Sequence, residues 1–420
     1  MTRVLGSARE VLAPGRIASF VRAALDADDY TGKRVCVLVP DATRSCPLPA
    51  LLDSVHAALH GRAAELTFLV ALGTHPAMTE RQLAAWLGYP PGDSARRYPG
   101  VAIRNHEWWR PEMLVSVGTI PAAELAALSG GRITRPVDVR LNRAVVRADV
   151  VLVVGPVFPH EVVGFSGGSK YLFPGVAGQE IIDVSHWLGA LITSAEIIGA
   201  PGVTPVRELI NRAAARVPAA LRCFGLVVES GSTDLHAITY GGTEDAWAAA
   251  AAITAEADIR YLDAPARRVL SLVSERYDEL WTAAKGMYKV EPVVADGGQV
   301  VLYAPHVTEV SRTHGAAIAE IGYHCRDYFV RQWDRFAHQP WGVLAHSTHV
   351  RGAGTWSNGV ENCRVRVTLA TQLTPQQCAD INLGYRDPAS INIEDFADRE
   401  DEGVLLVRKA GEQLYRLEEK

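Results

Sequence analysis

The segment from His160 to His186 places two imidazoles and a primary amine around a glycine-rich loop. The loop reads Gly-Phe-Ser-Gly-Gly-Ser-Lys and ends at Lys170. Glycine lets a backbone approach a ligand closely, the lysine amine can be charged or covalently modified, and imidazole can bind a metal or move a proton. The combination therefore indicates a ligand-binding or catalytic segment.

Two familiar motifs do not account for this segment. The loop lacks the Gly-Lys-Ser/Thr order of a Walker A motif, and Gly164 stands where a zincin motif starting at His160 needs its second histidine. Each residue also has a simple structural explanation: a tight turn for the glycines, a solvated side chain for Lys170 and a packed imidazole for His186. Each explanation is adequate singly, but together they leave the cluster unexplained.

Polar residues also follow two apolar runs nearer the start of the chain. Asp41-Ala-Thr-Arg44 follows residues 35–40, and Gly-Thr-His75 follows residues 66–72. Open α/β sheets bind ligands beyond the carboxyl ends of their strands. There Arg44 could grip a carboxylate, Asp41 could orient it or contact a ligand hydroxyl, and His75 could transfer a proton. The alternatives are an Asx turn or helix cap with a local ion pair, and a surface or structural histidine.

The second half of the chain offers two weaker candidates. Lys285 lies near the start of a predicted helix and could bind an anion, although a surface lysine beside a core Trp281 is the simpler interpretation. Residues 346–356 are predicted to form a histidine-rich loop after a strand at 342–345. This loop could line the same cleft as Lys285, or it could form only a network of its own.

The pattern of apolar residues predicts the elements that position these side chains. Continuous apolar runs at 35–40, 66–72, 150–157 and 221–228 are typical of strands buried on both faces. Helices are expected at 49–61, 80–87, 179–187 and 244–257, and this alternation indicates a mainly parallel sheet with crossover helices. In the second half we expect strands at 269–273, 298–303, 342–345, 365–369 and 404–407, and helices at 280–294 and 316–336.

Length and composition bound the architecture and the class of partner. A chain of 420 residues exceeds what one core usually supports, and residues 262–268 contain a proline among small and charged residues. We therefore expect two α/β domains, 1–264 and 268–420, with mainly parallel sheets and the active-site cleft between them. The net charge of −5 argues against nucleic acid as the partner. Six scattered cysteines without a CxxC pair indicate reduced thiols, and the absence of a membrane span or signal peptide predicts a cytoplasmic protein.

Taken together and in order, four motifs resemble the nickel-pincer lactate racemases and their 2-hydroxyacid racemase and epimerase homologues. The resemblance extends over nearly the whole chain, and Lys285 matches more weakly. The motifs are DATR ending at Arg44, GTH ending at His75, PHEVVGFSGGSK ending at Lys170, and His186 in the following helix.

The resemblance implies a cofactor and a role for each site residue. The cofactor would be the nickel-pincer nucleotide, pyridinium-3,5-bisthiocarboxylic acid mononucleotide nickel, attached covalently to a lysine and supplied by cofactor-biosynthesis enzymes. The roles implied are the covalent link for Lys170 within a loop formed with Ser166, Gly167 and Gly168, the nickel ligand for His186, the acid/base pair for His75 and His160, the substrate carboxylate for Arg44, orientation of a catalytic histidine for Asp41, and a substrate or cofactor contact for Lys285.

The resemblance further implies inversion of C2 by reversible hydride transfer, since the C2 hydrogen beside an ionised carboxylate is a very weak acid. Thr282 stands where lactate-specific members carry glutamine, with Ala283 and Ala284 beside it. These small residues predict a substrate larger or more polar than lactate, such as a sugar acid. Two alternatives remain open: a nickel-pincer cofactor carrier without turnover, and a zinc hydrolase using His75, His160 and His186, which would leave Lys170 without a role.

Overall fold

The computed structural model describes residues 1–73 and 75–418, and the chain divides into two compact units. The first unit contains Met1–Phe158, Phe165–Ser185 and Pro201–Ala257. The second unit contains Pro159–Gly164, His186–Ala200 and the chain from Asp258 onward. The sequence predicts the domain boundary at 264–268, a few residues after the chain last leaves the first unit at Ala257. The prediction does not include the two short segments that the second unit takes from the first half of the chain.

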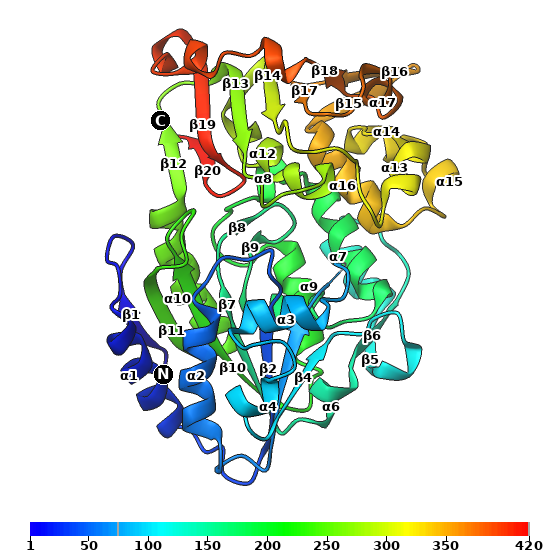
Figure 1. The fold of residues 1–420 in the computed structure, drawn as a ribbon. Coiled ribbons are helices and arrows are strands. Elements are labelled where there is room, and N and C mark those ends of the chain that lie inside the picture. The colour runs from blue at the N-terminus through cyan, green and yellow to red at the C-terminus, as the bar shows by residue number, and fades with distance from the viewer. Residues whose placement is uncertain (74, 419–420) are drawn as a thin grey trace. The chain divides into compact units, whose positions relative to one another are not determined.

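A seven-stranded sheet forms the centre of the first unit (Figure 1), with the order β1-β11-β10-β7-β2-β3-β4. The strands from β10 to β4 are parallel, and β11 is antiparallel to both of its neighbours. From β2 the chain moves outward through β3 to β4, and from β7 it moves to β10 on the other side. The strand order therefore reverses between β2 and β7, the position at which such sheets bind ligands. The bounds are β1 Arg3–Gly6, β2 Arg34–Pro40, β3 Glu65–Ala71, β4 Val101–Asn105, β7 Val150–Pro156, β10 Ala220–Val228 and β11 Leu235–Gly242.

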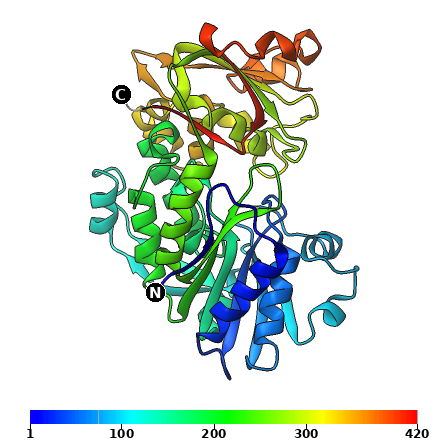
Figure 2. The same cartoon turned by 90° about the vertical axis from the view of Figure 1, so that its left-hand side faces the viewer.

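Helices cover both faces of this sheet. Figure 2 shows the blue helices α1 (Pro14–Asp26) and α2 (Leu48–Leu59) on one side of it and green helices on the other. On the second face α10 (Thr243–Asp258) approaches closely, because a Cβ at Gly225 of β10 would lie 3.0 Å from the Cβ of Ala250. The unit also contains the antiparallel pair β5 (Leu114–Ile120) and β6 (Val137–Asn142), together with α3 Glu80–Leu87, α4 Ser94–Arg97, α5 Ala122–Leu128, α6 Arg143–Arg147 and α9 Pro205–Ala214.

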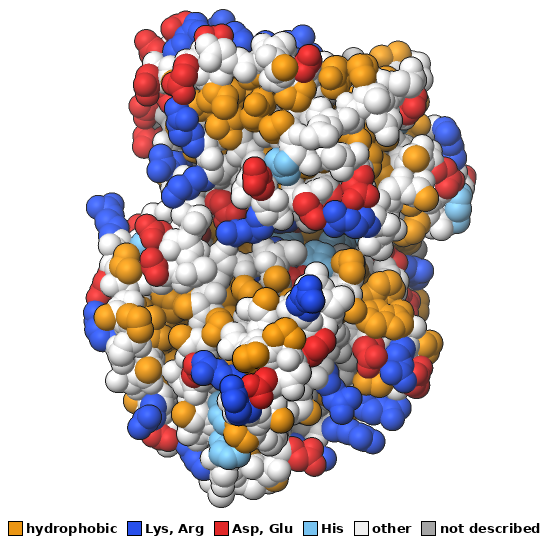
Figure 3. Space-filling model, in the orientation of Figure 1, with side chains coloured by type: hydrophobic (Ala, Val, Ile, Leu, Met, Phe, Trp, Pro, Cys, Tyr) orange, Lys and Arg blue, Asp and Glu red, His pale blue; other side chains and the backbone are white. Residues whose placement is uncertain are grey.

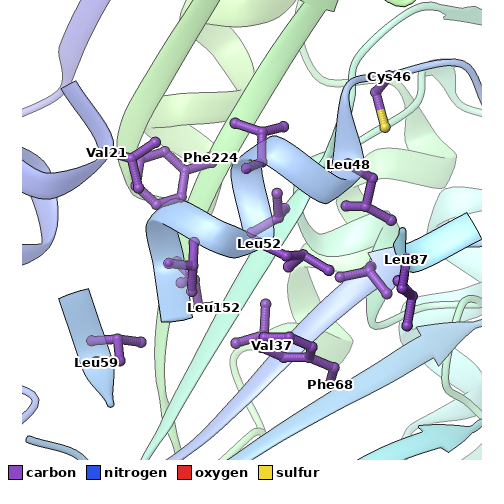
Figure 4. Packing of buried hydrophobic residues seen from close by; sticks show 14 of the residues in the cluster. Val21, Val37, Cys46, Leu48, Leu52, Leu59, Phe68, Leu87, Leu152 and Phe224 are labelled. Carbon is purple, nitrogen blue, oxygen red and sulfur yellow. The ribbon is translucent and has the colours of Figure 1, made fainter. Parts of the chain in front are cut away.

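The core between α1, α2 and the sheet explains why the apolar runs in the sequence predict strands. Alternate residues of β2, Val35, Val37 and Val39, belong to the cluster that α1 and α2 cover. Figure 4 shows Leu48 and Leu52 of α2 among side chains from four strands and helix α1. Burying each such side chain stabilises the fold by about 1.5–3 kcal/mol, so the continuous apolar strands are the strongest signal in the sequence. The predicted strands and helices of this half are confirmed within a few residues at their ends.

The second unit contains a five-stranded parallel sheet with the order β18-β17-β14-β13-β19. Successive strands move outward from β13 through β14 and β17 to β18, while β19 lies on the other side of β13, so the strand order reverses between β13 and β19. The bounds are β13 Ala266–Val273, β14 Val294–Tyr303, β17 Arg366–Ala370, β18 Gly384–Tyr385 and β19 Val404–Ala410. The predicted α/β class with mainly parallel sheets is confirmed.

Smaller elements complete the second unit. Two-stranded pairs are formed by β12 with β20 and by β15 with β16, and β8 pairs with β9. The segments that the second unit takes from the first half of the chain include β8 and the part of α7 from His186 onward. The earlier part of α7 belongs to the first unit. The bounds are α7 Gln179–Ile192, α8 Ser194–Ile197, α11 Leu280–Ala283, α12 Lys285–Tyr288, α13 Gly315–Ile321, α14 Arg326–Arg331, α15 Trp333–Phe336, α16 Trp341–Arg351, α17 Pro375–Asp380, β8 Pro159–His160, β9 Gly164–Phe165, β12 Ile259–Leu262, β15 Gly354–Ser357, β16 Val360–Cys363 and β20 Leu414–Leu417.

Four predictions for this half are wrong. Residues 342–345 lie in helix α16, because a short apolar run does not distinguish a strand from a buried helix. Residues 346–356 are accordingly not a loop but the end of α16 and the start of β15. The expected single helices at 280–294 and 316–336 are each broken into shorter pieces, and Gly322, with φ +69°, ends the first piece of the latter.

The surface carries both signs of charge. On the face drawn in Figure 3, acidic and basic side chains are intermixed over both units. Among residues 1–73 and 75–418, no helix is long and apolar enough to cross a bilayer.

Candidate functional site

Two loops meet at the carboxyl edge of the first sheet, one after β2 and one after β3. The Asp41 carboxylate is hydrogen-bonded through Oδ2 to Nδ1 of His75. Its other oxygen, Oδ1, accepts from the Thr43 hydroxyl at 2.6 Å and from the Thr43 backbone N–H at 3.2 Å. Because β2 and β3 are parallel neighbours, residues that follow them reach the same edge. The carboxylate therefore fixes the ring of His75 and leaves Nε2 as the nitrogen for proton transfer.

The electrostatics of Asp41 keep its carboxyl group ionised. Burial by itself raises the pKa of Asp41, but the charge and hydrogen bond of His75, the charge of Arg44 and the hydrogen bond of Thr43 outweigh it. The pKa consequently lies below its ordinary value. An ionised carboxylate at this position stabilises the positive charge that His75 acquires when it accepts a proton.

Arg44 lies across the point where the strand order reverses. Its guanidinium carbon is 5.1 Å from the ring centroid of Phe158, which follows β7, and Nη1 donates to Oγ1 of Thr43 at 3.3 Å. The side chain is partly exposed. A guanidinium packed against an aromatic face and a hydroxyl is the kind of group that can bind a carboxylate bidentately.

The conformation of the loop that carries Lys170 depends on two glycines. Gly167 and Gly168 have φ of +84° and +58°. A Cβ at Gly167 would lie 2.5 Å from Cγ2 of Val157, and one at Gly168 would lie 2.8 Å from Cβ of Trp247. Only glycine fits both the conformation and the space. The chain then enters the short 3-10 helix Gly168–Tyr171, in which Lys170 is partly exposed.

Two side chains behind this loop hold its carbonyl groups. The guanidinium of Arg207 is fully buried and donates to the carbonyl oxygens of Phe165 at 2.7 Å, Gly167 at 3.1 Å and Ser166 at 3.4 Å. Arg207 lies 3.9 Å from the ring centroid of Trp247, whose Nε1 donates to the Ser166 carbonyl at 2.8 Å. Burial lowers the pKa of Arg207 to about 10, against the charge of Glu244, so the group remains cationic at neutral pH. The loop is therefore preorganised.

The Lys170 loop joins the two other loops of the first unit. The Gly73 backbone N–H donates to the Gly175 carbonyl at 2.9 Å, which connects the end of β3 with the segment after Lys170. The Tyr171 ring packs on Gly155 of β7. Burial, followed by the charges of neighbours that include Cys46 and Asp41, raises the pKa of Tyr171 well above the ordinary value, against the charge of Arg44. The first unit thus gathers the predicted residues Asp41, Arg44, His75, Ser166, Gly167, Gly168 and Lys170.

The other three predicted site residues, His160, His186 and Lys285, belong to the second unit. Nδ1 of His160 accepts a hydrogen bond from the Val162 backbone N–H at 3.2 Å and lies 3.3 Å from Oε2 of Glu161. A neutral His160 therefore has its proton on Nε2, whereas the Glu161 carboxylate can pair with a protonated Nδ1. This histidine has a carboxylate neighbour, as His75 has Asp41.

His186 lies near a buried histidine that the sequence treated only as part of a loop. His349 of α16 is 3% exposed, and neither of its ring nitrogens has a hydrogen-bond partner among the described residues. Burial lowers the pKa of His349 to about 4. The charge of Glu161 raises this pKa, and the charge of His186 lowers it. An uncharged imidazole with two open nitrogens among Glu161 and His186 is a group that could bind a metal, a cofactor or a polar substrate.

Lys285 lies where the strand order of the second sheet reverses. Its Nζ is 4.8 Å from the ring centroid of Tyr277, and a Cβ at Gly411, just after β19, would lie 2.9 Å from the Lys285 Cβ. The Tyr277 hydroxyl donates to Glu412 at 2.9 Å. Lys285 therefore lies at the edge where open α/β sheets bind ligands, and its anion-binding role stays a prediction.

The three small residues that precede Lys285 differ in their exposure. Ala283 and Ala284 are 1% and 0% exposed, so they fill the core of the second unit and cannot enlarge a pocket. Thr282 is partly exposed, and its hydroxyl donates to the Glu279 carbonyl at 3.1 Å. Beside it, Trp281 stacks on His346 at 3.7 Å between ring centroids. Of the three small residues, only Thr282 can bear on substrate size.

The structure adds Arg207, Trp247, Glu161 and His349 to the surroundings of the predicted residues. Arg207 and Trp247 lie outside the motifs, whereas Glu161 lies within one without an expected role and His349 lies in the stretch expected to be a loop. Within residues 1–73 and 75–418, no group of three His, Cys, Asp or Glu side chains is arranged to hold a metal. The three-histidine zinc centre therefore gains no support. A cofactor that needs only one protein ligand to its metal is compatible with this observation.

Comparison with known proteins agrees with the fold and the motifs. The lactate racemase N-terminal domain family matches residues 22–198. A lactate racemase from Thermoanaerobacterium thermosaccharolyticum is 25% identical over 279 residues, which cover 65% of this chain and 60% of the racemase, less than two thirds of its length. A solved protein from Thermotoga maritima is 32% identical, with a TM-score of 0.88, and the match covers 99% of this chain and 100% of that one.

The structure of the lactate racemase apoprotein from Thermoanaerobacterium thermosaccharolyticum shares the fold, with a TM-score of 0.72, 19% identity, and coverage of 96% of this chain and 93% of that one. Fold and site thus define a two-unit α/β protein with candidate ligand-binding residues at the carboxyl edge of each main sheet. The chain is lactate racemase-like: residues 22–198 match the N-terminal domain of that family, and its curated relative is a lactate racemase.

Proposed function

We propose that this protein is a racemase or epimerase that inverts C2 of a 2-hydroxyacid. The observation that carries the proposal is the contact between Asp41 and His75 beside Arg44, at the carboxyl edge where the first strand order reverses. A carboxylate-bound imidazole next to a guanidinium suits a substrate that offers a hydroxyl proton and a carboxylate on adjacent carbons. The match to the lactate racemase N-terminal domain supports the same class of reaction.

Each predicted residue then has a role that its environment supports. Arg44 would hold the substrate carboxylate through its guanidinium, and Nε2 of His75 would take the hydroxyl proton of one enantiomer and return it. His160, with Glu161 beside Nδ1, would be the acid/base group for the other enantiomer. Lys285 would contact the substrate or cofactor as a cation.

The nickel-pincer nucleotide would be held by Lys170 through a covalent link and by His186 as the protein ligand to nickel. The residues fit such a group: Arg207 braces the glycine loop that holds Lys170, and the buried Ser169 hydroxyl has no hydrogen-bond partner among the described residues. When bound, the nucleotide supplies an acceptor for the C2 hydrogen together with its electron pair. The protein, cytoplasmic on this proposal, would receive it from cofactor-biosynthesis enzymes.

The substrate would be larger or more polar than lactate, such as a sugar acid. With Ala283 and Ala284 buried, this part of the proposal is supported by Thr282 and by the polar wall of Trp281, His346 and Lys285. Imidazole and ammonium groups can bind hydroxyl or acidic groups beyond C2.

The test is a substrate panel of lactate, malate, phenyllactate and aldonates, assayed in deuterated solvent with protein produced beside the cofactor-building enzymes. Inversion of C2 without uptake of solvent deuterium supports the proposal, and turnover of lactate alone would reject the larger substrate. Intact mass should show an adduct that the Lys170→Ala variant lacks. An adduct without turnover of any substrate would favour the cofactor carrier, and exchange as fast as inversion would replace internal hydride return by proton abstraction.

A further inference from the structure

A pair of cysteines lies in the second unit, outside the proposed site. Cys325 is the N-cap residue of α14, and Cys363 ends β16. Gly354 pairs with Cys363 in the β15–β16 ladder, and a Cβ on it would lie 3.0 Å from both the Cys325 Cβ and the Cys363 Cα. The two side chains share a hydrogen bond. The Cys325 Cβ therefore lies within about 6 Å of the Cys363 Cα, close enough for a disulfide to join the two residues.

A guanidinium holds one of the two sulfurs. Nε of Arg351 donates to Sγ of Cys363 at 3.0 Å, and Nη1 of Arg351 donates to the Asn382 carbonyl at 3.1 Å. The hydrogen bond from Cys325 lowers the pKa of Cys363, burial opposes the shift, and the charge of Arg351 adds to it. The same hydrogen bond, together with burial, raises the pKa of Cys325. Cys363 is thus the more acidic thiol and accepts the hydrogen bond, and Cys325 is the thiol that donates it.

The backbone of the pair is fixed by a carboxylate. Oε1 of Glu361 accepts from the Cys325 backbone N–H at 2.6 Å, and Oε2 is 3.0 Å from both Nδ1 of His324 and Nδ2 of Asn382. These contacts hold the start of α14 against β16, so the thiols stay opposed. Cys363 is partly exposed and Cys325 is buried. An oxidant can therefore reach Cys363 first.

We propose that Cys325 and Cys363 are a redox-active dithiol that a peroxide oxidises to a disulfide. The Cys363 thiolate attacks one peroxide oxygen, so that an S–O bond forms, the O–O bond breaks and the departing oxygen leaves as water after taking a proton. Sulfur loses two electrons and the peroxide gains them. Sγ of Cys325 then attacks the sulfenic sulfur, an S–S bond forms, the S–O bond breaks, and the hydroxyl leaves as water with the Cys325 proton.

Oxidation also weakens the hydrogen bond from Nε of Arg351 to Cys363, because a disulfide sulfur accepts hydrogen bonds only weakly. Arg351 is the last residue of α16, the helix that carries His346 and His349. The state of the dithiol is therefore connected to the helix whose imidazoles lie near His186 and Lys285 within the second unit.

The experiment treats the reduced full-length protein with a small excess of hydrogen peroxide at neutral pH, under conditions that leave it folded by circular dichroism. We expect the intact mass to fall by about 2 Da, two of the six thiols to be lost, and peptide mapping to show a Cys325–Cys363 linkage. Cys325→Ser should stop at a sulfenic acid on Cys363 that dimedone traps. Cys378→Ala, which removes another buried thiol of the same unit, should oxidise as the wild type does.

Alkylation rates test the part played by Arg351. Iodoacetamide should modify Cys363 faster than any other cysteine at pH 7, and Arg351→Gln should slow that reaction several-fold without changing the alkylation of Cys46 or Cys223. Retention of all six thiols in peroxide, a disulfide between other cysteines, or equal alkylation rates in the Arg351→Gln variant would overturn the proposal.

Discussion

The carboxylate of Asp41 accepts a hydrogen bond from Nδ1 of His75, although the two residues are 34 positions apart. They meet because β2 and β3 are parallel neighbours, so that the residue after one strand reaches the residue after the next. The consequence is chemical as well as structural. A buried, ionised carboxylate determines which nitrogen of His75 faces a ligand and stabilises the imidazolium form.

Asp41→Asn should therefore lower kcat by about 10²–10⁴-fold while leaving the fold intact, because an amide can keep the contact but cannot stabilise the imidazolium. Steady-state kinetics of cofactor-loaded protein measure the effect. Asp149→Asn is the matched control, since Asp149 pairs with Arg34 at the start of β2, the opposite end of the same strand. Equal kcat in Asp41→Asn and wild type would remove His75 from the acid/base role.

Arg207→Lys should destabilise the first unit by about 3 kcal/mol. Arg207 reaches its carbonyls through two separate nitrogens, and a compact ammonium cannot span the same acceptors or stack a planar group on Trp247, so buried acceptors are left unpaired. Urea unfolding measures the loss, and amide hydrogen exchange should rise in residues 164–171. Arg212→Lys on the same helix, where the side chain is about one-third exposed and pairs with Glu208, should change stability by less than about 0.5 kcal/mol. Similar losses in the two variants would mean that Arg207 does not support the loop.

The sequence predicts elements where one signal dominates. The run from Val35 to Pro40 is apolar throughout because both faces of β2 are covered. By contrast, β4 is only partly buried and ends in Arg104-Asn105, so its weak pattern was not recognised as a strand. Residues 342–345 were taken for a strand because their burial in α16 removes the polar face that marks a helix.

The candidate site divides in the same way. Motifs at strand ends could be found, since Asp41, Arg44 and His75 each follow an apolar run. Arg207 could not be found, because its contacts with the Phe165 and Gly167 carbonyls depend on how α9 packs against a loop 40 residues earlier. His349 carries no local signal either, since its significance lies in burial without hydrogen-bond partners. The catalytic and binding roles remain predictions.

His349→Phe should leave the free energy of unfolding unchanged or raise it by about 1 kcal/mol, because the ring is buried and uncharged and gives up no hydrogen bond among the described residues. Turnover should fall at least tenfold if the open nitrogens serve a ligand. His346→Phe on the same helix is the comparison, since Nε2 of His346 is bonded to the Trp281 carbonyl at 2.9 Å and its loss should cost about 1–2 kcal/mol. A large loss of stability in His349→Phe would instead assign this residue a structural role.

Lowering the pH should destabilise the first unit through His106, at a pH where the carboxylates of this unit are still ionised. His106 is buried, with Nε2 3.0 Å from the Ala177 carbonyl and Nδ1 3.1 Å from Nδ2 of Asn142, so its neutral form donates at one nitrogen and accepts at the other. Burial lowers its pKa to about 4, against the hydrogen bond to Ala177. A proton on Nδ1 would face the amide donors of Asn142.

The sign follows from proton binding in the two states. Between pH 6.5 and 4 the unfolded chain protonates this imidazole and the folded protein does not, so the free energy of unfolding falls as the pH is lowered, by up to about 3 kcal/mol at pH 4. Urea unfolding at pH 7, 6 and 5 should show this fall, and His106→Gln should be less stable at pH 7 but depend less on pH. His60→Gln, at an exposed histidine, should keep the wild-type slope. His349 contributes to the same pH window, so the test is the difference in slope between variants, and an unchanged slope in His106→Gln would show that His106 is protonated equally in both states.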